Sequence, residues 1–373
     1  MLLGGCGMFG GGSTVEPPAE LVDFEPVARI DELWSIDAGR GPDRMFLRLA
    51  PALERDVLYV TDTRGRVQAL TAATGKQVWE RKLQLEVTSG VGVGDGLVLV
   101  GTGKGVVVAL DRNTGNEQWR AQAASEILAP PAAESGVTVA QSVDGKISAF
   151  SSATGKRLWV FERTEPALSL RGTASPVTVG DAVLTGFASG KLAAIGLRDG
   201  RALWEIPVAQ PQGRSEIERL VDVDAPVLLA GRLLVSAAYQ GKIVAVNLEN
   251  GRLLWSRDIS TYSAMSADGG NVYVSDDRGH VYALDLRSGA TIWKQEQLQG
   301  RRPSAPAVVG PAVAVGDLDG YVHWLARDDG RFLVRERAAR DPILVTPLAD
   351  GATLYVAAQN GELSALRYQP RTP

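Results

Sequence analysis

The sequence predicts an all-β protein. It should form an eight-bladed β-propeller of four-stranded antiparallel blades, its ring closed by an N-terminal strand that completes the last blade. Three observations predict this fold. A short phrase ending in tryptophan recurs along the chain, each copy lies in a unit of four short apolar runs, and the last unit lacks one run. A repeat of about 40–50 residues is typical of propellers and solenoids.

The recurring phrase is ALDRNTGNEQW at residues 109–119, with a turn glycine four residues before its tryptophan. Related phrases end at Trp79, Trp119, Trp159, Trp204, Trp255 and Trp293, and Val334 takes the corresponding place in the next copy. The steps from Trp79 onward are 40, 40, 45, 51, 38 and 41 residues. Regular recurrence at one strand position favours a core role, in which each tryptophan packs one blade against the next, over a ligand-binding role.

One unit, residues 51–82, contains the runs PALE, VLYVTD, RVQAL and QVWERK, separated by the turns ERD, TRG and AATGK. Runs this short between turn residues predict strands, and turns this short allow only antiparallel hairpins. The glycine of each Thr-Gly turn supplies a backbone angle with positive φ at no steric cost. A lone four-stranded unit cannot cover both of its faces, whereas radial stacking of copies can, which predicts a propeller.

The first strand of a unit is predicted to start near Ala50, Ser89, Ala129, Ala174, Ala225, Ser263, Ala305 and Thr346, which gives eight units. The last unit stops after its third strand. Residues 27–36, which carry Trp34, precede the first unit and are predicted to supply the missing fourth strand. This pairing removes two open edges that would otherwise favour aggregation. Trp324 falls on a third strand, outside the series.

Composition excludes several classes of function. The chain has 373 residues and a net charge of −4, which argues against tracking a nucleic-acid backbone. No apolar run reaches the roughly 18 residues of a membrane span. His280 and His323 have no second histidine or cysteine at ligand spacing, and no nucleophile motif is present. We therefore expect no catalytic residues, no metal and no cofactor.

The N-terminus carries the only cysteine, Cys6, in LLGGCG, which resembles a bacterial lipobox. We expect Cys6 to be acylated; the alternative is a chance cysteine near the start. Five preceding residues are too few for a signal peptide, so the true start is expected further upstream. Gly7 follows the cysteine, and by resemblance to enterobacterial lipoproteins this favours the outer membrane. Residues 1–25 are interpreted as a lipobox remnant and flexible tether, and residues 26–373 as one propeller domain.

Two of the repeat steps, 45 and 51 residues, are longer than the others. The turns inside these units keep their length, so the extra residues belong to the connections from the fourth strand of one blade to the first strand of the next. Both connections emerge on one face and are neighbours there. They carry ALSLRGTASPV (167–177) and ERLVDVDAPVL (218–228). Long loops on a regular scaffold commonly bind partners, and we expect an apolar centre with a charged rim.

The phrase A-x-D-x-x-T-G-x-x-x-W resembles the repeat of pyrroloquinoline-quinone enzymes, but the chain lacks their cysteine pair and long insertions. The lipobox, tether, blade number and two loop stretches together resemble the propeller lipoprotein family of the outer-membrane barrel assembly machinery, the Bam complex. The resemblance implies a non-enzymatic scaffold lipoprotein, anchored at the periplasmic face of the outer membrane. It also implies binding to the periplasmic POTRA domains of the membrane-embedded barrel component of that machinery, and assistance in the insertion of outer-membrane proteins. It assigns partner contacts to Leu168, Leu170, Arg171, Asp222 and Asp224.

Three alternatives stay open. Arg171 and the two aspartates could form only a local ion pair. Unfolded outer-membrane clients could touch the propeller directly, by adding a strand to an outer edge. A different class of function, a periplasmic quinoprotein-like enzyme or small-ligand sensor, is the rival interpretation.

Overall fold

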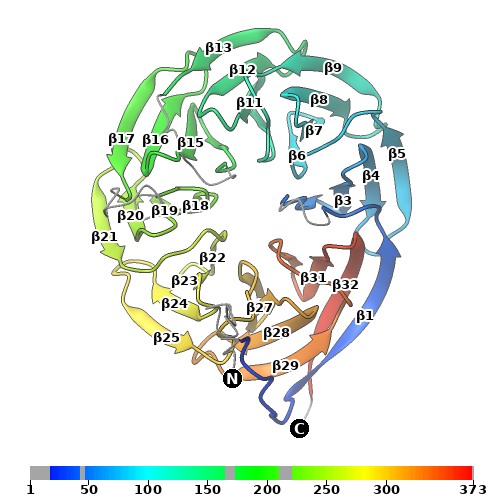
Figure 1. The fold of residues 1–373 in the computed structure, drawn as a ribbon, viewed down its shortest axis with the longest axis vertical. Helices are drawn as coiled ribbons and strands as arrows, with labels where there is room; N and C mark the ends of the chain where they lie inside the picture. Colours follow the sequence, from blue (N-terminus) through cyan, green and yellow to red (C-terminus); the bar gives the residue numbers. More distant parts are fainter. Residues whose placement is uncertain (1–16, 43–46, 164–172, 210–220, 372–373) are drawn as a thin grey trace, which may run out of the picture.

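The computed structural model describes residues 17–42, 47–163, 173–209 and 221–371. Within these ranges the chain forms eight four-stranded antiparallel sheets and no helix, so it has no helix that could cross a lipid bilayer. The sheets stand as blades around a central axis, and the first strand of each blade is innermost (Figure 1). The predicted eight-bladed propeller is confirmed.

The strands of each blade are called A to D from the centre outward. Blades 1 to 4 follow one another along the chain, with these strands: β2 (Ala52–Glu54), β3 (Val57–Thr61), β4 (Arg66–Thr71), β5 (Gln77–Lys82); β6 (Gly92–Gly94), β7 (Leu97–Gly101), β8 (Val106–Asp111), β9 (Glu117–Gln122); β10 (Ala132–Glu134), β11 (Val137–Gln141), β12 (Ile147–Ser151), β13 (Arg157–Phe161); β14 (Val177–Val179), β15 (Ala182–Gly186), β16 (Lys191–Gly196), β17 (Ala202–Pro207).

Blades 5 to 8 complete the ring, and β1 from the N-terminus is the D strand of blade 8. Their strands are these: β18 (Leu228–Ala230), β19 (Leu233–Ala237), β20 (Ile243–Asn247), β21 (Leu253–Arg257); β22 (Ser266–Ala267), β23 (Asn271–Ser275), β24 (Val281–Asp285), β25 (Thr291–Gln295); β26 (Ala307–Val309), β27 (Ala312–Gly316), β28 (Tyr321–Ala326), β29 (Phe332–Arg337); β30 (Leu348–Asp350), β31 (Thr353–Ala357), β32 (Glu362–Pro370), β1 (Ala28–Asp37).

The ring closes by pairing the two ends of the chain, as predicted. Strand β1 runs antiparallel to β32 from Ala28 opposite Pro370 to Asp37 opposite Glu362, with a bulge just before Trp34. In Figure 1 the dark blue strand lies along the outer side of the red one. Blade 8 therefore needs strands from both ends of the sequence to be complete.

The repeated phrase joins each blade to the next. The Trp79 indole Nε1 donates a hydrogen bond of 2.9 Å to the Arg112 carbonyl oxygen in the next blade. The ring of Trp79 lies under the turn glycine Gly115, where a Cβ atom would be 2.6 Å from the indole. Gly115 also has φ +69°, a conformation that favours glycine. The tryptophans of the series therefore have the predicted core role between blades.

Val334 breaks the series for a structural reason. Each tryptophan packs under the C-to-D turn of the following blade, but blade 8 has no such turn because its C and D strands are opposite ends of the chain. Val334 instead packs with Ala28 and Tyr368 from the closing strands. Trp324 lies on β28, a C strand, as predicted, and is fully buried.

The connections from D strands to the next A strands share one face with the B-to-C turns, as predicted. After β5, Leu83 N donates to Gly65 O in the B-to-C turn of the same blade, and after β17, Val208 N donates to Gly190 O. We call this side the connection face. The C-to-D turns, which include Gly115, lie on the opposite face.

Residues 17–26, part of the predicted tether, have no regular secondary structure but lie against blades 6 and 7. The Arg301 guanidinium donates to Ala19 O at 3.0 Å, and the Arg335 guanidinium donates to Val22 O at 2.8 Å. The ring of Phe24 stacks on an aromatic ring of β29 with centroids 5.3 Å apart. The chain therefore reaches its first strand by way of the junction between blades 6 and 7.

Candidate functional site

The extra residues of the two long repeat steps lie where the sequence predicted them. They fall between β13 and β14 and between β17 and β18, which are consecutive D-to-A connections on the connection face. Leu168, Leu170 and Arg171 belong to the first connection and lie outside the described residues, as does Cys6.

Asp222 and Asp224 lie at the end of the second connection, and both are buried, with 1% and 5% exposure. Asp222 O accepts a hydrogen bond of 2.8 Å from Tyr239 N, and Val223 N donates to Phe187 O. The segment thus ties blade 5 to the B-to-C turn of blade 4. The sequence suggested that these acids form a charged rim, whereas the structure places both side chains in the interior.

The two carboxyl groups are hydrogen-bonded to each other, and burial raises the pKa of Asp224. The hydrogen bond from Asp222 and the positive charge of Arg48 act in the opposite direction but do not cancel the effect of burial. When two carboxyl groups are in contact, the form in which one of them is protonated is favoured over the form in which both are charged.

Asp224 belongs to a ring of equivalent positions that the sequence reasoning missed. Each lies four residues before the start of an A strand, where the chain turns into the centre of the propeller. The eight residues are Arg48, Thr88, Leu128, Thr173, Asp224, Tyr262, Pro303 and Leu344. Counting back from the predicted A strands would have located these eight positions. It would not have shown which of their side chains contact one another.

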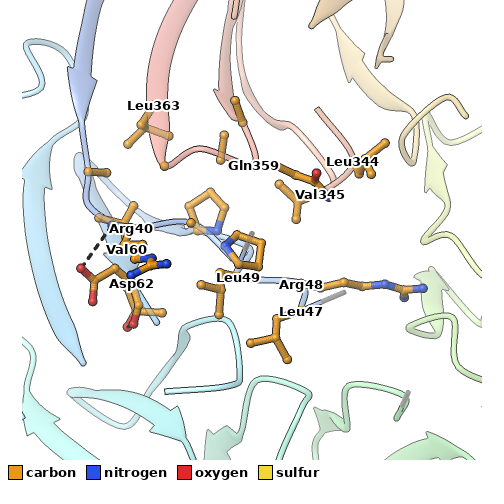
Figure 2. Close-up of a pocket in the computed structure, with 18 of the residues that line it drawn as sticks. Arg40, Leu47, Arg48, Leu49, Val60, Asp62, Leu344, Val345, Gln359 and Leu363 are labelled. Atoms are coloured by element: carbon orange, nitrogen blue, oxygen red, sulfur yellow. Dashed lines mark hydrogen bonds between the residues drawn. The ribbon is translucent and has the colours of Figure 1, made fainter. Parts of the chain in front are cut away.

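Seven of these eight residues, all except Thr88, line a central cavity of about 390 Å³. The D-to-A connection that follows β1 runs through the centre and supplies Leu47, Arg48 and Leu49 to the lining. Figure 2 shows Arg48 pointing away from Arg40 and Asp62, toward the other side of the opening. Its guanidinium lies over the ring of Tyr262, 5.7 Å from the centroid. An arginine of blade 1 thereby reaches residues of blades 5 and 6.

Exposed apolar side chains gather on the outer strands of the blades beside the long connections. Of the eight large apolar residues with high exposure in the described chain, five belong to β13, β17 and β21: Leu158, Val160, Leu203, Leu253 and Leu254. Three of the five hold the position before the D-strand tryptophan, which is also exposed and apolar at Val78 in blade 1 and Ile292 in blade 6. Blades 3 to 5 therefore combine the long connections with this apolar rim.

Both histidines are buried next to an aspartate, and His280 forms a contact of 2.8 Å from its Nδ1 to Asp276 Oδ2. His323 is fully buried and forms a contact of 2.9 Å from its Nε2 to Asp317 Oδ2, and burial lowers the pKa of His323. Arg301 Nε donates to the same carboxylate at 2.8 Å and also holds the N-terminal segment. Among the described residues, no group of three or more His, Cys, Asp or Glu side chains is placed to hold a metal ion.

Fold and repeat together define the class of this protein, a β-propeller built from PQQ-like repeats. A family model described as outer membrane protein assembly factor BamB matches residues 27–89, 63–295 and 287–369. The chain belongs to this family.

Individual relatives agree with this assignment. The chain is 50% identical over 349 residues to the outer membrane protein assembly factor BamB of Pseudomonas aeruginosa, covering 94% of this chain and 92% of the relative. It is 30% identical to the protein of the same name from Salmonella typhimurium, covering 98% and 96%.

Solved structures show the same fold. The crystal structure of BamB from Moraxella catarrhalis superposes with a TM-score of 0.82 at 25% identity, covering 91% of this chain and all of that one. A quinohemoprotein alcohol dehydrogenase from Comamonas testosteroni superposes with a TM-score of 0.72 at 16% identity, covering 92% and 77%. At that identity the second likeness shows the fold alone.

Proposed function

We propose that this chain is a non-enzymatic scaffold lipoprotein of the outer-membrane barrel assembly machinery. In this role it binds the periplasmic POTRA domains of the machinery's membrane-embedded barrel component and assists assembly and insertion of outer-membrane proteins. The family of its relatives supports this function, since they are named as outer membrane protein assembly factors. The structural observation that supports the proposal is the place of the two lengthened connections in the chain, as consecutive D-to-A connections whose neighbouring D strands carry exposed apolar residues.

The proposed docking surface consists of the two long connections, with Leu168, Leu170 and Arg171 as its contacts and Asp222 and Asp224 as its buried support. An apolar centre with an arginine is the usual composition of a protein–protein hot spot. Because Asp222 and Asp224 are buried, we assign them to holding the second connection in place beneath the surface that the partner would meet.

The proposed location is the periplasmic face of the outer membrane, with the chain held there by acyl groups on Cys6. Two or more acyl chains give firm membrane binding, which a single chain does not. Mass spectrometry of Cys6 in protein made from the full-length gene tests this part. An unmodified thiol would contradict it.

The docking surface is tested with single substitutions and purified POTRA domains of the barrel component from the same organism. Leu170→Ala and Arg171→Ala should each weaken binding by about 1 kcal/mol or more, because truncation at a hot spot typically costs at least this much. Asn113→Ala, in a C-to-D turn on the opposite face, is the control and should bind as the unmodified chain does. Melting temperatures should be equal for all three.

Two results would contradict the docking surface. Normal binding by Arg171→Glu would remove the arginine from the interface. Equal weakening by substitutions on both faces would indicate a general loss of structure, or contact elsewhere on the propeller.

A further inference from the structure

The central cavity has the size and lining of a ligand site. Its volume of about 390 Å³ is within the range of small-molecule pockets, roughly 300–1,000 Å³. Its wall is largely apolar, and the side chains that make it so include Leu47, Leu49, Leu128, Leu344, Val345 and Leu363. Water gains little in a space with such walls, because it needs several polar partners. The cavity therefore suits an apolar group better than a cluster of waters.

One side of the cavity is polar and positively charged. Arg48 extends over Tyr262, and its positive charge also acts on the buried Asp224 carboxyl. Arg302 also lines the cavity. The negative groups are less available: the Asp62 carboxylate accepts hydrogen bonds from Arg66 Nε and two backbone amides, among others. The Asp224 carboxyl is hydrogen-bonded to the Asp222 carboxyl.

A hydroxyl group on the same lining has no partner. The Oγ1 atom of Thr173 is buried and makes no hydrogen bond within the described residues. A buried polar atom without a partner costs free energy, and because protein atoms enclose this oxygen, the Thr173 side chain would have to rotate before a group in the cavity could bond to it.

We propose that the central cavity binds a small organic anion with an apolar body, and that Arg48 is its charged contact. The ring of Tyr262 positions Arg48 across the centre, where its guanidinium would meet the negative group of the ligand. Arg48, the charged contact of the cavity, is not among the residues of the proposed docking surface, so substitutions at Arg48 and at Arg171 test the two proposals independently.

The test uses two dyes with the same apolar body, 8-anilinonaphthalene-1-sulfonate and the uncharged N-phenyl-1-naphthylamine. Each is titrated by fluorescence into the full chain. Arg48→Met should weaken the sulfonate about tenfold, the loss expected for one hydrogen bond to a charged group, and leave the neutral amine nearly unchanged. Arg278→Met removes an exposed arginine from a B-to-C turn on the same face and should alter neither dye.

A cavity-filling substitution locates the site. Leu344→Trp should weaken both dyes, because the larger side chain occupies the space that their common body needs. Val345→Phe serves the same purpose if the first variant does not fold. An unchanged sulfonate affinity in Arg48→Met would overturn the assignment of the charged contact. Unchanged binding of both dyes in the filled variants would place them on the outer rim and overturn the proposal.

Discussion

The glycine of a C-to-D turn is favoured by its positive φ and by the tryptophan ring that lies beneath it. Comparing Gly115 with Gly96, which has only the positive φ, distinguishes the two effects. Gly115 has φ +69° and the Trp79 ring beneath it, whereas Gly96 has φ +76° and open space, with no atom within 4 Å of where a Cβ would stand. Gly96→Ala should lose about 1–2 kcal/mol of unfolding free energy from backbone strain alone. Gly115→Ala should lose about 1–3 kcal/mol more, because the methyl group collides with the indole. Urea unfolding of both variants measures the difference, and equal losses would mean that the tryptophan contact does not restrict this position.

The buried Asp224 predicts a dependence of stability on pH. Burial raises the pKa of its carboxyl in the folded chain, so folding favours the protonated form. The stability that this proton provides is complete below the unfolded pKa, about 3.9, and is lost as the pH rises through the folded pKa. Asp224→Asn cannot ionise and escapes this loss. Its unfolding free energy relative to the unmodified chain should therefore increase from acid to neutral pH, and a difference that stays constant would contradict the assignment.

At the scale of the strands, the sequence predicted most of what the structure shows. The recurring phrase placed blades 1 to 7, because each copy contains a turn glycine and, except at Val334, a tryptophan that packs against the next copy. Blade 8 was placed by its three remaining strands and by residues 27–36. The burial of Asp222 and Asp224 could not be predicted in this way. Asp222 is bonded to Tyr239 of blade 5, and Asp224 lies near Arg48, which comes from blade 1. Contacts between residues of distant blades cannot be recognised from the spacing of residues within one repeat.

Strand β1 has two roles, closing blade 8 and covering blade 1. Its backbone pairs with β32, and the Trp34 indole donates a hydrogen bond of 2.9 Å to Ala72 O while lying under Gly75. A chain that begins at residue 40 should lose several kcal/mol, of which removal of the aromatic ring alone accounts for about 3–5 kcal/mol. It should also associate through the exposed edge of β32. Thermal unfolding and sedimentation measure both effects, and a monomer that melts like the full chain would refute the closure.

At the scale of the whole molecule, the N-terminal segment leaves the propeller at a defined place. Pro18 lies next to Gly300, and Ala19 is held by Arg301, at the junction of blades 6 and 7. Strand β13 of blade 3 lies across the ring from β29 (Figure 1). Ten residues lie between Cys6 and Pro17, and the eleven steps from one to the other span at most about 36–40 Å when fully extended. If Cys6 carries the lipid, the junction of blades 6 and 7 stays near the bilayer, while blades 3 and 4 with the long connections can extend away from it.

This orientation can be measured with two matched labels. Ile292 on β25 and Leu158 on β13 occupy the same position, one residue before the tryptophan of a D strand, and both are 47% exposed. Cysteine at either position can carry a fluorophore in the acylated chain, because Cys6 is then blocked. In vesicles with a quencher attached to the lipid headgroups, the label at 292 should be quenched more strongly than the label at 158, because quenching falls steeply with distance. Equal quenching would mean that the propeller lies flat on the membrane or is not held at its N-terminus, and stronger quenching at 158 would reverse the proposed presentation of the docking surface.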